Sequence, residues 1–216
     1  VLGLVDVCIC PSVTMKALLR QHWRGPIKVM EDALEVAPLE PKQVVGSPVT
    51  ALWFGHASNI GYLKQFLESS FTPTQRVRII ALTNEAGANW FLKVAPRVSA
   101  NVRVEIGIWS MPNMLVAAAV SDICLIPSDT TDIRKSGVSS NRLITALTLG
   151  LPTAADRLPA YAEFSDYFVD IRAERFHSLI ADPLAYREKV VQAQQQVVPR
   201  FSSQALGQQW GELFND

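Results

Sequence analysis

The chain has no surplus of charge of either sign. Its 20 basic and 20 acidic side chains cancel to a formal net charge of 0 over 216 residues. The overall field therefore gives no reason to expect nucleic acid or an anionic membrane as a partner, and any anion site must be local. No apolar stretch is long enough to span a membrane, and the first residues lack the basic start of a signal peptide. We expect a cytoplasmic protein without an integral membrane segment, at most peripheral at a membrane in a longer form.

Cysteine is also scarce. The chain has three cysteines, an odd number, and each lies inside an apolar run: Cys8, Cys10 and Cys124. Such a pattern fits small buried side chains in a reducing compartment better than a disulfide framework, and the spacing is not that of metal ligands. The D-x-x-D pair Asp129 and Asp132 is only a weak metal signal, because basic residues that can pair with it follow directly. We therefore expect no bound metal and no cofactor.

The sequence lacks the fingerprints of several enzyme classes. It contains no G-x-x-x-x-G-K-[ST] P-loop and no G-x-G-x-x-G dinucleotide motif. The string GVSSN at 137–141 differs from the G-x-S-x-G elbow of the α/β hydrolases. These three classes are thereby set aside.

Apolar residues are plentiful, at 49%, so the chain can bury a core. Short β-branched runs recur, most of them about 20 to 30 residues after the last, which is the span of a βαβ unit. Because helical stretches fill the gaps, the sequence predicts an α/β fold with a doubly wound parallel sheet covered by helices on both faces. The expected strands are 51–55, 77–83, 102–108, 123–127, 152–156 and 167–170, and the expected helices are 59–69, 87–95, 113–121, 140–149 and 184–198.

The two ends differ from the middle. Residues 4–31 read as strand, helix and strand, one unit of a second α/β domain that is too short to bury its own core. The chain begins at Val1 inside that first strand, so we interpret the sequence as a piece of a longer protein. We expect a remnant of an N-terminal domain at 1–36, a proline-rich linker at 37–48, a Rossmann-like domain at 49–200 and a last helix, capped by Ser202 or Ser203, within 201–216.

The loop at 128–139 follows the fourth central strand and is the first candidate site. In open α/β sheets ligands bind beyond the carboxyl ends of the strands, where helix N-termini converge. The next helix begins near Ser139 or Ser140, and its first amides have no intrahelical partners, so they would suit a phosphate. Arg134 and Lys135 add positive charge, and Ser128, Ser139, Ser140 and Asn141 offer short polar side chains. The alternative is that Ser140 only caps its helix and the basic pair lies in water.

The turn GHASNIG at 55–61 is the second candidate. Gly55 lets the backbone approach a ligand closely, and the next helix starts at Ser58 or Asn59. His56 is either an acid, base or phosphate ligand or an ordinary surface residue. Trp109 and Met111, after the third central strand, would wall a slot for a base or else belong to the core.

The string SDICLIPSDTTDIRKSGVSSNRLITALTLGLPTAADRLP at 121–159 resembles the donor-binding C-terminal half of the GT-B glycosyltransferases. There a strand ending in Pro-Ser leads to a polar loop, and a helix closes in an EALA-Gly-Leu-Pro phrase, which here reads ITALTLGLP. The string DVCICPS with IKVMEDALEV also resembles the last unit of the acceptor domain, and FSSQALGQQW the closing helix that returns toward it.

The resemblance implies transfer of a sugar from a nucleotide diphosphate sugar to a hydroxyl of a glycan or small-molecule acceptor, without an essential metal, as in cell-surface polysaccharide biosynthesis. The acceptor domain that carries the general base is nearly all absent, so no catalytic residue is assigned and we expect this chain alone to transfer no sugar. The implied diphosphate ligands are Lys135, Ser139, Ser140, Asn141, Arg142, Gly55 and His56, and the implied nucleotide contacts are Trp109, Ser128 and Thr145.

Two carboxylates of the GT-B pattern are missing. Many retaining members have a glutamate at the position of Thr145, where it holds the ribose, and another at the position of Gly137. The Arg and Lys pair that often follows the first strand in this family is also not evident in GHASNIG. Either Lys135 and Arg142 take over that positive charge, or the nucleotide is bound weakly. Two other functions stay open: a non-catalytic α/β module for protein contacts, and a sugar-nucleotide epimerase of the same architecture. The sequence assigns neither the base nor the sugar, the acceptor or the stereochemistry.

Overall fold

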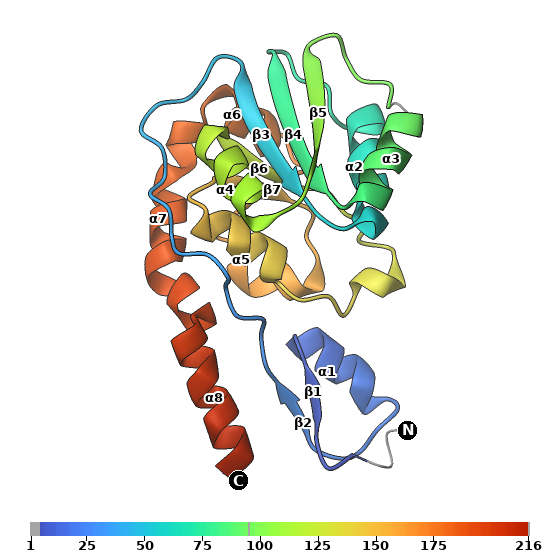
Figure 1. Cartoon of the computed structure of the whole chain (residues 1–216), viewed down its shortest axis with the longest axis vertical. Coiled ribbons are helices and arrows are strands. Elements are labelled where there is room, and N and C mark those ends of the chain that lie inside the picture. The colour runs from blue at the N-terminus through green and yellow to red at the C-terminus, as the bar shows by residue number, and fades with distance from the viewer. Residues whose placement is uncertain (1–4, 95, 216) are drawn as a thin grey trace.

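A computed structural model describes residues 5–94 and 96–215. Its main body is a six-stranded sheet of order β5-β4-β3-β6-β7-β8, and every neighbouring pair is parallel (Figure 1). The predicted doubly wound α/β fold is thereby confirmed. The strands are β3 (Val49–Phe54), β4 (Val77–Thr83), β5 (Val102–Ile108), β6 (Ile123–Ile126), β7 (Thr153–Ala155) and β8 (Val169–Asp170).

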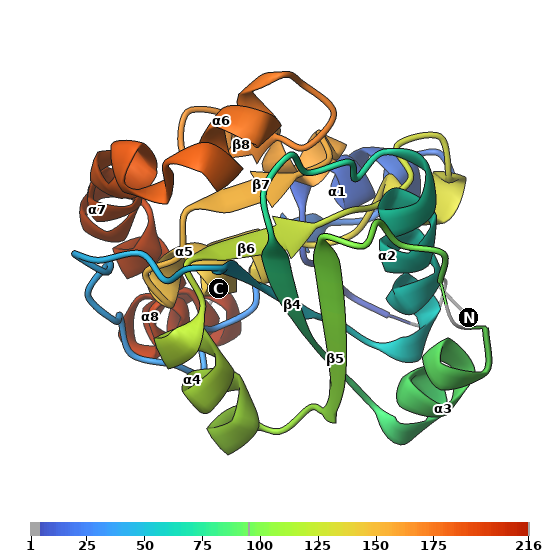
Figure 2. The same ribbon diagram turned by 90° about the horizontal axis from the view of Figure 1, so that it is seen from above.

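Helices cover both faces of this sheet because its central strands are apolar on both sides. In β3, Ala51 and Trp53 face one core cluster, whereas Leu52 and Phe54 face the other. Figure 2 shows α2 and α3 on one side of β4 and β5, and α4 on the other. The first face is covered by α2 (Ala57–Ser69), α3 (Glu85–Val94) and α6 (Arg175–Ala181), and the second by α4 (Met111–Val120), α5 (Asn141–Thr148) and α7 (Arg187–Gln196).

The N-terminal unit is small, as the sequence predicted. It consists of β1 (Cys8–Cys10), α1 (Val13–Arg20) and β2 (Ile27–Val29), and the two strands form a parallel sheet of their own. In Figure 1 this unit and the last helix, α8 (Ser203–Asn215), both lie at the lower end of the molecule. Ser202 is the residue that caps α8, since its Oγ accepts a hydrogen bond from Ala205 N at 3.2 Å.

The segment 31–39, which we call the strap, leads from β2 to the main body. Glu31 accepts two hydrogen bonds from Arg200, at 2.9 and 2.6 Å. Further along, Leu34 N donates to Phe201 O at 2.9 Å and Leu39 N donates to Thr148 O at 2.8 Å. The strap is therefore fastened to the main body near its start, its middle and its end.

Most element boundaries lie within about two residues of the predictions, and three differences matter for the description of the fold. The helix after β3 begins at Ala57 with His56 as its cap, rather than at Ser58 or Asn59. The predicted helix 184–198 is divided into the 3-10 turn η4 (Pro183–Tyr186), α7 and the 3-10 turn η5 (Val198–Phe201). In addition, α6 was not predicted at all. Two further 3-10 turns, η2 (Ile133–Lys135) and η3 (Pro159–Phe164), lie in the loops after β6 and β7.

Candidate functional site

A cavity of about 400 Å³ opens at the carboxyl edge of the main sheet. Five segments meet there. The strap is one, and the others are the β3–α2 turn, the β4–α3 turn, the β5–α4 turn and the first turns of α5, because parallel strands present their outgoing loops at one edge. The lining residues are Ala33, Glu35, Val36, Phe54, Gly55, His56, Asn59, Asn84, Trp109, Met111, Met114, Asn141, Arg142 and Thr145. Six of the predicted site residues are therefore brought together, namely Gly55, His56, Trp109, Asn141, Arg142 and Thr145.

Arg142 carries an unpaired positive charge in the wall of this cavity. Its Nε and Nη2 atoms are buried and have no hydrogen-bond partner. The guanidinium instead lies over two aromatic rings, 5.4 Å from the centroid of Trp53 and 5.9 Å from that of Phe54. Burial lowers the pKa of Arg142, but a guanidinium remains protonated in proteins. A buried cation without a counterion is costly, so the site is suited to receive an anion.

The N-terminus of α5 opens onto the same cavity. Asn141 and Arg142 are its first two residues, and both line the cavity. Ser140 is the N-cap residue of α5, but its side chain makes no capping hydrogen bond. Free amides of this first turn carry positive partial charge and add to the attraction that Arg142 exerts on an anion.

Gly55 keeps the space beside Arg142 open. A Cβ atom at this position would lie 3.2 Å from two atoms of the Trp53 ring and 3.5 Å from Arg142 Cζ. Glycine thus allows the end of β3 to lie directly against the indole and the guanidinium. The close approach of this backbone to a ligand stays a prediction.

His56 and Asn84 organise the helix starts on the other side of the cavity. His56 Nδ1 accepts a hydrogen bond from Ser58 N at 3.3 Å, so a neutral imidazole carries its proton on Nε2. Asn84 Oδ1 accepts from Ala57 N at 3.1 Å and from Gly87 N at 3.3 Å, which ties the first turns of α2 and α3 together. Asn84 was not singled out from the sequence. Its position between an apolar strand and the next helix, where asparagine often caps a helix, is the signal that could have identified it.

The side chain of Lys135, at the end of η2, packs against α2 and does not line the cavity. Its Nζ donates to Asn59 Oδ1 at 2.6 Å and lies 5.0 Å from the centroid of the Tyr62 ring. Burial lowers the pKa of Lys135, and the nearby charge of Arg142 lowers it further. Because Asn59 itself lines the cavity, Lys135 is held one residue away from it.

The acidic residues of this loop are also paired. Asp132 Oδ2 accepts a hydrogen bond from Tyr62 Oη at 2.5 Å and forms an ion pair with Arg134, whose Nη2 lies 2.8 Å away. Arg134 lowers the pKa of the Asp132 carboxyl most, and Tyr62 lowers it further. The two neighbouring basic residues therefore have different partners. Arg134 pairs with Asp132, whereas Lys135 contacts α2.

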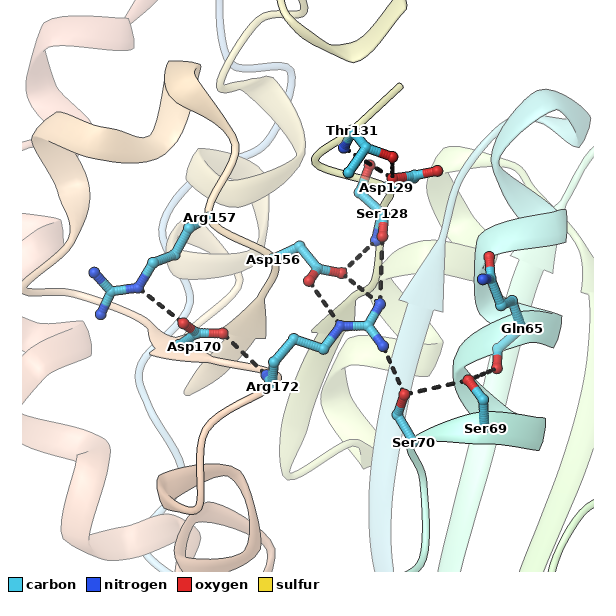
Figure 3. A network of polar contacts seen from close by, with 10 residues as sticks. All are labelled: Gln65, Ser69, Ser70, Ser128, Asp129, Thr131, Asp156, Arg157, Asp170 and Arg172. Atoms are coloured by element: carbon cyan, nitrogen blue, oxygen red, sulfur yellow. Dashed lines mark hydrogen bonds and ion pairs between the residues drawn. The ribbon is translucent and has the colours of Figure 1, made fainter. Parts of the chain in front are cut away.

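Ser128, Ser139 and Ser140 do not line the cavity. Ser128 N donates to Asp156 Oδ2 at 2.8 Å, and Ser128 O accepts from Arg172 Nη2 at 3.3 Å. Figure 3 shows Arg172 pointing at Asp156, with which it forms a two-pronged ion pair, and at Ser70 on the far side. The start of the loop is therefore fixed through its backbone, and the Ser128 side chain is buried behind the site.

Metal-ligand clusters and membrane-spanning helices are both absent from the described part of the chain. Within 5–94 and 96–215, no group of three or more His, Cys, Asp or Glu side chains is arranged to hold a metal ion. In the same ranges, no helix combines the length and apolarity that crossing a membrane requires.

Neither a protein-family model nor a curated protein matches the sequence. Solved structures do match the fold. TarM aligns over 100% of this chain and 44% of its own, at a TM-score of 0.67 and 10% identity. Anabaena HepE, in complex with UDP and glucose, aligns over 100% and 64%, with a TM-score of 0.69 and 14% identity. WaaG, a glycosyltransferase of lipopolysaccharide biosynthesis, aligns over 92% and 61%, with a TM-score of 0.57 and 13% identity.

The chain has a GT-B-type fold. The fold that the resemblance implied is thereby confirmed, and the chain spans less than two thirds of the length of each of these GT-B proteins. The cavity lies at the carboxyl edge of a Rossmann-like sheet, the position where such sheets bind nucleotides. Which of the lining residues bind a ligand stays a prediction.

Proposed function

We propose that the chain is the donor-binding part of a glycosyltransferase, which holds a nucleoside diphosphate sugar while the sugar passes to a hydroxyl group of an acceptor. The observation that carries the proposal is the buried guanidinium of Arg142, unpaired at Nε and Nη2, in the wall of a cavity of about 400 Å³. A volume of this order is typical of small-ligand sites. TarM has been solved with UDP, and HepE with UDP and glucose, which supports a nucleotide ligand in a GT-B-type cavity.

The chemistry follows from where charge develops. When the bond between the sugar carbon and the diphosphate oxygen breaks, its electron pair stays on the diphosphate, which gains negative charge. Arg142 and the first amides of α5 stabilise that charge from fixed positions, which is the electrostatic contribution that lowers the barrier. Because the protein supplies the positive charge, the transfer proceeds without a metal ion. The sugar carbon then bonds to the acceptor oxygen.

The acceptor's proton passes to a base that belongs to an acceptor domain rather than to the donor cavity. The acceptor is a glycan or a small molecule with a free hydroxyl, as in the building of cell-surface polysaccharides. The 44% of TarM that the chain spans leaves room for such a domain in a whole protein. The chain alone therefore binds the donor and transfers nothing.

Isothermal titration with UDP, GDP and ADP tests the proposal. We expect the folded chain to bind at least one of them, and Arg142→Gln to weaken that binding about 10- to 100-fold, since a charged hydrogen bond contributes about 1.5 to 3 kcal/mol. Arg134→Gln is the matched control, because Arg134 lies on the preceding loop, is exposed and pairs with Asp132. Absence of heat with all three nucleotides, in a sample shown to be folded, would reject the donor-binding role in favour of a non-catalytic module.

A further inference from the structure

The strap contributes an acidic residue to the wall of the cavity. Glu35 lines it together with its neighbours Ala33 and Val36, although sequence analysis assigned this segment to the remnant of another domain. Among the described lining residues, Glu35 is the one with an acidic side chain, and Arg142 the one with a permanent positive charge. The cavity therefore has two charged positions of opposite sign, on segments more than 100 residues apart in sequence.

Glu35 is held in place by its backbone and free at its carboxylate. Leu34, the preceding residue, donates its amide to Phe201 O at 2.9 Å, and Leu34 and Val36 pack on the main core. Within the described part of the chain, the Glu35 side chain has no hydrogen bond or ion pair, in contrast to Glu31, which is bound by Arg200. The backbone at Glu35 is therefore held in place, and its exposed carboxylate is available to accept hydrogen bonds from a ligand.

The chemistry of a carboxylate selects what Glu35 can bind. It only accepts hydrogen bonds, and its two oxygens match the two donors of adjacent hydroxyl groups. It repels phosphates, which are drawn instead to Arg142. The apolar surface of Trp109, Met111 and Met114 suits neither phosphates nor hydroxyl groups, and it favours a flat base. A hydroxyl-rich sugar is the part of a donor that remains for Glu35.

We propose that Glu35 binds the transferred sugar of the donor through a pair of adjacent hydroxyl groups, and that it thereby distinguishes a nucleoside diphosphate sugar from the free nucleoside diphosphate. The proposal rests on the donor-binding function and names a residue for its specificity. Arg142 holds the diphosphate common to both ligands, whereas Glu35 contacts only the group that is transferred. Loss of the sugar then removes the attraction at Glu35 and leaves its repulsion of the remaining diphosphate.

Titration of the wild-type chain and of Glu35→Gln with UDP, UDP-glucose and UDP-N-acetylglucosamine tests this assignment. We expect Glu35→Gln to bind at least one of the two sugar conjugates about tenfold more weakly, as for loss of a charge-assisted hydrogen bond. Its affinity for UDP should be unchanged or higher. Glu40→Gln, an exposed glutamate just beyond the strap that does not line the cavity, is the control and should change neither affinity.

The possible results separate the two proposals. Weaker binding of a sugar conjugate with intact binding of UDP supports the role of Glu35. If Glu35→Gln changes UDP and both conjugates equally, or changes none of them, the role of Glu35 is overturned while donor binding stands. If the wild-type chain binds none of UDP, GDP and ADP, both proposals fall together. If it binds GDP or ADP instead of UDP, the same comparison is made with the sugar conjugates of that nucleotide. Glu35→Asp, which keeps the charge on a shorter side chain, should lie between wild type and Glu35→Gln for the conjugate and match wild type for UDP.

Discussion

Arg142→Met should make the ligand-free protein more stable. The guanidinium atoms Nε and Nη2 are buried without partners, and leaving a charged group in that state costs roughly 3 kcal/mol. Contact with the Trp53 and Phe54 rings offsets about 2 kcal/mol of this cost. Methionine fills similar space with no charge to desolvate. The net gain of about 1 kcal/mol corresponds to a rise in Tm of about 2 to 4 °C for a chain of this size.

A bound nucleotide should reverse the order of the two proteins. At a UDP concentration of about 100 times Kd, the wild-type chain gains about 2.7 kcal/mol of stability. A variant that binds about 30-fold more weakly gains only about 0.9 kcal/mol under the same conditions. Wild type then unfolds at the higher temperature, whereas without UDP it unfolds at the lower one. Differential scanning calorimetry of both proteins, with and without UDP, measures all four values.

Two results would refute this reasoning. If ligand-free Arg142→Met melts several degrees below wild type, the guanidinium stabilises the fold and is not an uncompensated charge. If UDP raises the Tm of both proteins by the same amount, Arg142 does not contact the ligand. Arg134→Met serves as the control, because its side chain is 81% exposed and pairs with Asp132 at the surface. It should shift neither Tm nor the response to UDP by more than a fraction of a degree.

Two further predictions concern the rest of the fold. Gly150 has a φ of 76°, and a Cβ there would lie 2.7 Å from Leu39 O, so Gly150→Ala should lower the free energy of unfolding by about 2 to 3 kcal/mol. Urea titration measures this loss against the control Gly207→Ala, where the added methyl group meets open space, and equal stability of the two variants would contradict the prediction. Burial raises the pKa of Cys124 to about 12, so its thiol in the native protein should react slowly with an aromatic disulfide reagent at pH 8. Mass spectrometry measures the rate of labelling, and equal rates for Cys124 in the native protein and in urea would disprove the prediction.

The sequence predicted the central sheet because its signal is local. Each inner strand is a short β-branched or apolar run, and β3 buries all six of its residues, so no polar pattern obscures it. Helix α6 was missed for the opposite reason. It is only seven residues long, and Glu174 before it has helical dihedrals and makes no capping bond, so no start signal marks it. Its three buried residues, Phe176, Leu179 and Ile180, fix it through tertiary packing instead.

The candidate site was predictable where it depends on strand ends and unpredictable where it depends on long side chains. Gly55, His56 and Trp109 directly follow strands, and parallel strands bring such residues to one edge. The position of the Lys135 amine depends on Asn59, which lies 76 residues away in sequence. Glu35 was hidden by its place outside the Rossmann-like domain, since nothing local indicates that the strap folds back onto that domain.

The structure gives a physical reason for the two missing carboxylates. A Cβ at Gly137 would lie 2.6 Å from Met15 Cε and 3.4 Å from Leu18 Cδ1, so the loop packs directly on α1. A glutamate there would meet apolar side chains with no partner for its charge. At the second position, Thr145 Oγ1 donates to Asn141 Oδ1 at 3.1 Å and is satisfied within its own helix.

With both positions committed in this way, the acidic group of the cavity comes from Glu35 in the strap. The N-terminal segment thus acts on the candidate site twice: α1 supports the loop at Gly137, and the strap supplies a wall and a charge. A division of the chain at residue 36 describes its covalent organisation but cuts through this site. Donor binding should therefore be sought in the chain with its N-terminal segment attached, since the Rossmann-like domain by itself contains only the cationic half of the cavity.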